Sequence, residues 1–290
     1  MTAHGYDLAV QVRGLRKRYG DVTAVDGIDL GIRRGEVFGL LGPNGAGKST
    51  TVEILQGNRD RDAGEVSVLG ADPATGTRAW RSRVGIVWQD ESAPAELTVR
   101  ETVRHFAGYY PRPRDPEEVI GLVGLEAKAD SRIKALSGGQ RRRLDVALGV
   151  IGGPDLLLLD EPTTGFDPAA RRQFWSLIRA LADEGTTILL TTHYLEEAEA
   201  LAHRLAVVAK GLVVAEGEPG ALRERYGTEV LVEWTEPDGT PRWERTGTPT
   251  RTIAGLMHRF DGEIPGLAVS RPTLEDVYLR LTGQRQEDAG

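Results

Sequence analysis

A short apolar run passes directly into a glycine-rich turn in the sequence Val37-Phe38-Gly39-Leu40-Leu41-Gly42-Pro43-Asn44-Gly45-Ala46-Gly47-Lys48-Ser49. A helical pattern follows this turn, from Thr50 to Gln56. Glycines allow the backbone to curl until successive N–H groups face an anion, and the start of a helix adds a favourable dipole. An ordinary glycine turn is the alternative, but a chain of this length and average composition matches the eight-residue pattern only about once in a hundred. The segment therefore predicts a phosphate-binding loop between a strand and a helix.

The same loop carries the side chains that a nucleoside triphosphate and its metal ion require. Lys48 is placed to reach the β and γ phosphates, and the Ser49 hydroxyl is placed to ligate Mg²⁺. We therefore expect ATP with Mg²⁺ as the ligand, held by residues 42–50.

Three further apolar runs, at residues 84–88, 156–159 and 187–191, are short and continuous. Such runs are typical of strands covered on both faces in a parallel sheet, and helical patterns at residues 50–56, 140–151 and 169–182 alternate with them. Period-two alternation predicts half-buried antiparallel strands nearer the N-terminus, around residues 10–12, 28–32 and 66–68. The predicted fold class is an α/β P-loop NTPase with a mixed-sheet core, an antiparallel β subdomain and an α-helical subdomain.

Two changes in sequence character predict the domain organisation. Strand signals disappear between Asp90 and Lys134, where Thr98 and Glu101 form a helix-opening capping box, so we expect a helical subdomain over about residues 90–150. After Gly217 a hairpin around Pro237-Asp238-Gly239 and a helix over residues 252–260 predict a separate, small α+β domain. We therefore expect a nucleotide-binding cassette over residues 1–217 and an accessory domain over residues 218–290.

Composition excludes several classes of protein. The 36 basic and 43 acidic residues give a net charge of -7, which argues against a nucleic-acid partner. The chain has no cysteine, which excludes disulfides and thiolate metal sites and is compatible with a reducing compartment such as the cytosol. Neither a secretory signal nor an apolar stretch long enough for a membrane span is evident, so any membrane role is expected to depend on a partner.

Two carboxylates end the apolar run over residues 156–159, and they are Asp160 and Glu161. In an open α/β sheet the carboxyl ends of the strands line the ligand crevice. We expect Asp160 beside the Mg²⁺ shell and Glu161 next to the attacking water. The alternative is that the pair caps the N-terminus of a following helix.

A second glycine turn, Leu136-Ser137-Gly138-Gly139-Gln140, precedes this acidic strand. Ser137 and Gln140 form a capping box, so the helix N-terminus with its two glycines presents amides and a hydroxyl to an anion. The turn resembles the signature of ATP-binding cassette (ABC) ATPases. That resemblance implies that residues 137–140 grip the γ-phosphate bound to the phosphate loop of a second copy, so that a head-to-tail homodimer encloses two ATP molecules.

Four more positions match the pattern of this family in the same order. Gln89 resembles the glutamine that senses Mg²⁺ and the γ-phosphate, and His193 resembles the switch histidine that contacts the γ-phosphate. Asp167 resembles a residue of the loop that crosses the dimer interface, and Tyr19 resembles the aromatic residue on which adenine stacks. The resemblance covers residues 8–217. It implies that Glu161, His193, Gln89 and Lys48 are catalytic and that Ser49, Gln89 and Asp160 hold the metal.

Arg141, Arg142 and Arg143 follow the glycine turn. A contact with an anion or RNA is one interpretation, but the negative net charge favours a solvated helix face that pairs with local acids.

The family resemblance also indicates the physiological role. It implies a transport ATPase at the cytoplasmic face of the cell membrane, which docks a separate permease through residues 88–110. The tail over residues 272–283 resembles the daunorubicin-resistance-like branch of drug exporters and predicts an amphipathic helix capped by Thr273. We therefore expect export of drugs or other hydrophobic compounds. The alternative is a soluble cassette ATPase that acts on ribosomes or DNA.

Overall fold

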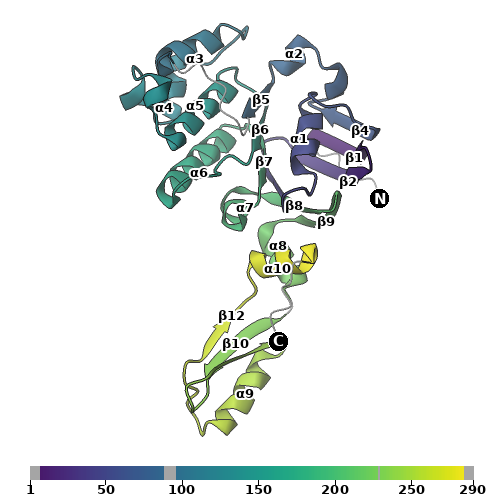
Figure 1. The fold of residues 1–290 in the computed structure, drawn as a ribbon, viewed down its shortest axis with the longest axis vertical. Coiled ribbons are helices and arrows are strands. Elements are labelled where there is room, and N and C mark those ends of the chain that lie inside the picture. Colours follow the sequence, from purple (N-terminus) through teal and green to yellow (C-terminus); the bar gives the residue numbers. More distant parts are fainter. Residues whose placement is uncertain (1–6, 88–95, 228, 284–290) are drawn as a thin grey trace. The chain divides into compact units, whose positions relative to one another are not determined.

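The computed structural model describes residues 7–87, 96–227 and 229–283, which form two compact units divided between Val214 and Ala215 (Figure 1). The division falls inside strand β9 (Leu212–Gly217), three residues before the boundary expected from the sequence.

A six-stranded sheet forms the centre of the first unit, in the order β5-β6-β7-β3-β8-β9. Neighbours among β5 (Val84–Val87), β6 (Leu156–Asp160), β7 (Thr187–Thr192), β3 (Val37–Leu41) and β8 (Arg204–Ala209) pair in parallel. Every residue of β3 and β7 is buried, which confirms the expectation that the apolar runs are covered on both faces. Alternate residues of β6 enter two separate cores: Leu157 and Leu159 enter one, and Leu156 and Leu158 the other.

An antiparallel sheet of order β2-β1-β4 packs on one side of this centre. It consists of β1 (Leu8–Tyr19), β2 (Val22–Arg33) and β4 (Ala63–Val68), which confirms the strands predicted from alternation near the N-terminus. Helix α1 (Lys48–Leu55) packs into the same core, and the short helix α2 (Arg78–Arg81) adds Trp80 to it.

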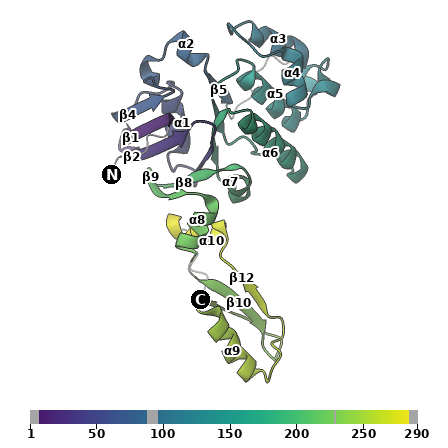
Figure 2. The same ribbon diagram turned by 180° about the vertical axis from the view of Figure 1, so that it is seen from behind.

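The helices cover the other face of the central sheet. Figure 2 shows α3 (Val99–Ala107), α4 (Pro116–Leu122) and α5 (Gly138–Val150) gathered on the side away from β1, β2 and β4. Thr98 and Glu101 form the predicted capping box of α3. Helices α6 (Pro168–Asp183) and α7 (Leu195–Leu201) complete this face, and short 3-10 turns occur at Pro73–Thr75, Glu126–Lys128 and Ile133–Ala135.

The second unit contains a three-stranded antiparallel sheet of order β11-β10-β12. The predicted hairpin joins β10 (Val230–Thr235) to β11 (Pro241–Thr246), and β12 (Ala268–Ser270) pairs with β10 on the other side. Helix α9 (Pro249–Arg259) covers one face of this sheet through a small core of Val232, Trp234, Leu256 and Ile264. Helices α8 (Pro219–Tyr226) and α10 (Leu274–Thr282) contact each other, and Thr273 caps α10 as predicted.

Across residues 7–87, 96–227 and 229–283, none of the helices combines the length and apolar character that crossing a bilayer requires.

Candidate functional site

The predicted phosphate-binding loop connects β3 to α1, and two of its glycines are required by close packing of backbone. A Cβ on Gly42 would lie 2.4 Å from the carbonyl oxygen of Val208, and a Cβ on Gly47 would lie 2.3 Å from that of Ala24. Gly47 is also the N-cap of α1 with a φ of 102°, a conformation that other residues rarely adopt. The loop thereby curls around a pocket of about 460 Å³, lined by Val22, Ala24, Asn44, Gly45, Gly47, Lys48, Ser49, Thr50 and Glu161.

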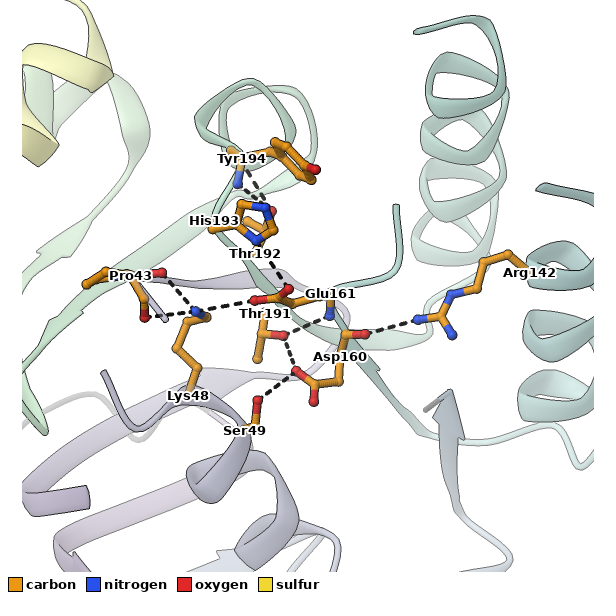
Figure 3. Close-up of polar contacts among 11 residues, drawn as sticks. Pro43, Lys48, Ser49, Arg142, Asp160, Glu161, Thr191, Thr192, His193 and Tyr194 are labelled. Atoms are coloured by element: carbon orange, nitrogen blue, oxygen red, sulfur yellow. Dashed lines mark hydrogen bonds and ion pairs between the residues drawn. The ribbon is translucent and has the colours of Figure 1, made fainter. Parts of the chain in front are cut away.

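Lys48 is buried at this pocket, with 4% of its surface exposed. Its ammonium group donates to the carbonyl oxygens of Gly42 at 2.8 Å and Pro43 at 3.2 Å, and lies 3.4 Å from Glu161 Oε1 (Figure 3). A buried ammonium group is stable only with such oxygen partners. These contacts hold the positive charge beside the loop, where a phosphate would bind.

The acidic end of β6 lies next to the phosphate-binding loop. Ser49 Oγ donates to Asp160 Oδ1 at 3.4 Å, and the Thr191 hydroxyl donates to the same oxygen. Thr191 Oγ1 also accepts the backbone N–H of Glu161 at 2.9 Å. The alternative that Asp160 and Glu161 cap a helix is wrong, because the next helix, α6, starts at Pro168 and is capped by Asp167.

Glu161 has a strained backbone and a carboxylate held between two basic side chains. Its φ of 45° lies in the left-handed region, which costs a residue other than glycine about 1–3 kcal/mol and persists only where the surroundings enforce it. Lys48 Nζ lies near Oε1, while His193 Nδ1 lies 3.2 Å from Oε2. The carboxylate is thus fixed at the pocket lining.

His193 directly follows β7, and contacts of its own segment set its orientation. The N–H of Tyr194 donates to Thr192 Oγ1 at 2.9 Å, and the Tyr194 ring packs on the His193 ring with centroids 4.1 Å apart. The guanidinium of Arg171 on α6 lies 4.5 Å from the Tyr194 ring centroid. The imidazole is therefore supported on the side of Tyr194 while it faces Glu161 (Figure 3).

The donor set beside the loop fits a magnesium ion. Ser49 and Asp160 present one hydroxyl and one carboxylate oxygen, and Mg²⁺ commonly takes one or two protein oxygens, with phosphates and water completing its shell. Gln89, the third expected ligand, lies outside the described residues. No group of three or more histidine, cysteine, aspartate or glutamate side chains in the described ranges forms another metal site.

A buried carboxylate, Glu197, lies on α7 behind the histidine segment and was not predicted from the sequence. Burial raises the pKa of Glu197, while polar contacts with Thr192, Thr163 and Trp175 and the charge of Arg171 act in the opposite direction. Neither carboxylate oxygen of Glu197 forms a hydrogen bond of good geometry with any of the described residues. Ionisation of this carboxyl group in the folded protein is therefore unfavourable.

We expect Glu197→Gln to raise the midpoint of thermal unfolding, and to raise it more at about pH 8 than at about pH 5. Since the folded-state pKa of Glu197 lies above its unfolded-state value, the wild type loses stability as the pH rises through the folded-state pKa. Glutamine cannot ionise, so the variant avoids this loss. Glu196→Gln changes an exposed carboxylate on the same helix and is the matched control. A gain that is equal at both pH values, or larger at the lower one, contradicts this prediction.

The glycine turn at residues 137–140 forms the N-terminus of α5. The N–H of Gln140 donates to Ser137 Oγ at 3.3 Å, and the N–H of Ser137 donates to Gln140 Oε1 at 3.0 Å, which confirms the predicted capping box. Ser137 and Gly138 are exposed, and Gly139 is half-buried. The turn does not belong to the lining of the pocket of its own chain. Its contact with the nucleotide of a second copy remains a prediction.

The expectation that the three arginines after this turn form a solvated face is wrong for Arg142. Only 7% of its surface is exposed, and its guanidinium donates to the backbone carbonyls of Asp160 and Pro162, both at 3.0 Å. Arg142 shares a helical stripe with buried Val146 and Val150, so its position on α5 directs it inward. Arg141 and Arg143 are half-buried.

Two predicted residues, Tyr19 and Asp167, are not among the residues that line the pocket. Tyr19 is 40% exposed; its hydroxyl lies 3.5 Å from Thr50 Oγ1, and the guanidinium of Arg59 lies over its ring. Asp167 is exposed and caps α6 by accepting the N–H groups of Ala169 and Ala170 at 2.8 Å. Adenine stacking for Tyr19 and an interface role for Asp167 stay predictions.

The structure thus brings five predicted residues together: Lys48, Ser49 and Glu161 line the pocket, Asp160 contacts Ser49, and His193 contacts Glu161. Sequence reasoning missed Thr191, which binds both Asp160 and the backbone of Glu161. A signal for it existed, because Thr191 ends the predicted strand that pairs with Asp160.

Known proteins resemble the chain over nearly its whole length. The family described as ABC transporter matches residues 25–164, and a family described as an AAA domain matches residues 132–197. The chain is 42% identical over 306 residues to the Nod factor export ATP-binding protein I of Ralstonia nicotianae, covering 96% of this chain and 95% of the relative.

Two solved structures share the fold of the first unit. The ATP binding subunit of an ABC transporter superposes with a TM-score of 0.67 and 27% identity, covering 76% of this chain and 93% of that one. The dimeric structure of MJ0796, a bacterial ABC transporter cassette, gives a TM-score of 0.63 and 25% identity, covering 72% and 98%.

A glycine-rich loop between strand and helix, a buried lysine in it and two carboxylates at the end of β6, two strands away in the sheet, define a P-loop ATPase. The chain belongs to the ABC transporter family. It is an ATP-binding subunit that hydrolyses ATP in transport.

Proposed function

We propose that two copies of this chain close around two ATP molecules and thereby drive a separate exporting permease at the cytoplasmic face of the cell membrane. The observation that carries the proposal is the convergence of Lys48 and His193 on the carboxylate of Glu161, which lines the pocket beside the phosphate-binding loop. The export function in the name of the Ralstonia relative supports the direction of transport.

Hydrolysis in this pocket relies on positioning and electrostatics. Lys48 neutralises charge on the β and γ phosphates, and Mg²⁺ held by Ser49 and Asp160 would supply further neutralisation. Glu161 orients a water molecule and accepts its proton as the water oxygen bonds to the γ-phosphorus. The bond from the γ-phosphorus to the bridging oxygen breaks in line, and the leaving oxygen departs with ADP. His193, beside Glu161, contacts the γ-phosphate.

The exposed turn at the start of α5 completes the site from the other copy. Ser137, Gly138 and Gly139 present a hydroxyl and amides at a helix N-terminus, which favours an anion. The dimeric solved structure of a similar cassette supports assembly as a dimer. ATP joins the two copies, and loss of the γ-phosphate that both copies contact allows them to separate. Closing and opening is the mechanical output that the permease uses.

The permease, more than this chain, is expected to select the transported compound. The relative in Ralstonia is named for export of Nod factor, and the C-terminal sequence resembles the daunorubicin-resistance-like branch of drug exporters. We infer that the exported compound is hydrophobic or has a hydrophobic part, as drugs of that class do.

A groove beside the helical subdomain is the docking surface that we propose for the permease. It has a volume of about 750 Å³ and is lined by Arg78, Ala79, Arg81, Ser82, Gly108, Tyr109, Tyr110 and Pro111. The Tyr109 side chain is 58% exposed at its rim. An exposed aromatic residue flanked by arginines is typical of the centre of a protein interface.

We expect Tyr109→Asp to weaken association with the permease by about tenfold, since loss of an aromatic anchor has effects of this size. The permease is first identified by its co-purification with the tagged wild-type chain from membranes of the source organism. The measurement is then the fraction of each variant bound to membranes that contain it, alongside the ATPase rate of the isolated chain.

Leu212→Asp is the matched control, because Leu212 is an exposed apolar residue outside the groove. Equal binding of the wild type and Tyr109→Asp would place the docking surface elsewhere. A fall in the ATPase rate of isolated Tyr109→Asp would show that the variant damages the cassette itself.

A further inference from the structure

Arg142 is buried on α5 and reaches out of that helix to the end of strand β6. Its Nε donates to the carbonyl oxygen of Pro162, and one terminal nitrogen donates to that of Asp160, each at 3.0 Å. Figure 3 shows the guanidinium approaching the end of β6 from the side opposite Lys48. The two carbonyls belong to the residues immediately before and after Glu161, so one side chain holds the backbone on both sides of it.

These contacts act on the peptide group that determines the conformation of Glu161. The carbonyl of Asp160 and the N–H of Glu161 belong to the same peptide unit. Arg142 binds its oxygen, and Thr191 Oγ1 binds its N–H at 2.9 Å. A peptide unit held at both ends cannot rotate freely, which explains how Glu161 keeps a φ of 45° that its side chain disfavours.

Arginine is suited to this task because its planar guanidinium presents several donors in a fixed fork, whereas lysine presents a single flexible charge. Burial lowers the pKa of Arg142, but the carboxylates of Asp145 and Asp160 oppose that shift. Asp145 lies on the same helix, with Oδ2 3.9 Å from the guanidinium. Nearby negative charge thus favours the ionised form that makes both contacts.

We propose that Arg142 is a positioning residue for hydrolysis, which holds Glu161 in its strained conformation by binding the carbonyls of Asp160 and Pro162. The inference rests on the proposed role of Glu161. Arg142 lies on α5, the helix that begins at the Ser137 turn. Arg142 therefore links this turn, which faces the second copy in the proposed dimer, to Glu161 of its own copy. Movement of α5 is thereby transmitted to Glu161.

The test compares Arg142→Lys with Arg143→Lys, the same change at a half-buried position one residue further along α5. We expect Arg142→Lys to lower kcat by about 10- to 100-fold, the range typical of a lost supporting contact to a catalytic group. Affinity for ATP, measured with a fluorescent analogue, is expected to stay unchanged because Arg142 does not line the pocket. Arg143→Lys is expected to retain both values.

A double-mutant cycle separates positioning from general structural damage. In a Glu161→Gln background, Arg142→Lys is expected to leave the residual turnover unchanged, since the residue on which it acts has lost its function. Equal losses in both backgrounds, or a loss of ATP affinity, would overturn the proposal. If Arg142→Lys does not fold, Arg142→Gln, which keeps donors for one carbonyl, carries the same comparison.

The same measurements test the role of Glu161 and the role of Arg142 separately. Should Glu161→Gln itself retain normal turnover, the proposed role of Glu161 fails. Should Glu161→Gln abolish turnover while Arg142→Lys leaves kcat intact, only the role of Arg142 fails.

Discussion

Glu161→Gln is expected to lower ATP turnover by about 100- to 10 000-fold while ATP binding is retained. Glutamine preserves the size of the side chain but cannot accept the proton of the attacking water. Because the γ-phosphate is no longer removed, the variant is expected to accumulate as a dimer with ATP and Mg²⁺. Light scattering after size exclusion measures this as a doubling of the mass, and phosphate release measures the turnover.

Glu126→Gln is the control for this experiment, because Glu126 is exposed in the helical subdomain and lies outside residues 42–50, 137–140 and 160–161. It is expected to match the wild type in both measurements. A Glu161→Gln variant that hydrolyses ATP at the normal rate and stays monomeric with ATP would show that Glu161 is not the catalytic base.

Lys48→Ala is expected to reduce turnover by at least about 100-fold and also to weaken ATP binding, in contrast to Glu161→Gln. The substitution removes the one buried ammonium group that the structure places at the phosphate-binding loop within the described ranges. It also leaves the carboxylate of Glu161 without this partner, which further disfavours a bound triphosphate. Titration with a fluorescent ATP analogue measures the affinity, and phosphate release measures the turnover.

Lys128→Ala removes an exposed lysine and is the matched control. Retention of wild-type ATP affinity by Lys48→Ala would contradict the assignment of residues 42–50 as the phosphate-binding loop. Comparison of Lys48→Ala with Glu161→Gln separates ATP binding from ATP hydrolysis, because only Glu161→Gln is expected to retain ATP binding.

The fold was predictable where local pattern and burial coincide. The apolar runs that became β3, β6 and β7 are buried throughout their apolar residues, so their short, continuous apolar character identified them. The capping boxes at Thr98 and Ser137 formed as expected, since they depend on residues only three positions apart. Gly42 and Gly47 were also accessible from sequence, because the loop geometry tolerates no Cβ at either position.

Other parts of the site depend on contacts between distant segments, and sequence pattern does not encode these. Arg142 was assigned to a solvated face because the net charge of the chain is negative, yet its partners are backbone carbonyls 18 and 20 residues away. Glu197 lies in a run of acidic residues that suggests a surface helix, but packing against α6 buries it completely. Buried charges are uncommon, so neither position was distinguishable from its exposed neighbours.

The most direct test of the nucleotide-sandwich mechanism is an experimental structure of Glu161→Gln with ATP and Mg²⁺. We predict two copies with two ATP molecules between them, each triphosphate bound by Lys48 and Ser49 of one copy and by Ser137 and Gly139 of the other. A structure in which each ATP lies on its own loop, while both glycine turns face solvent, would contradict it.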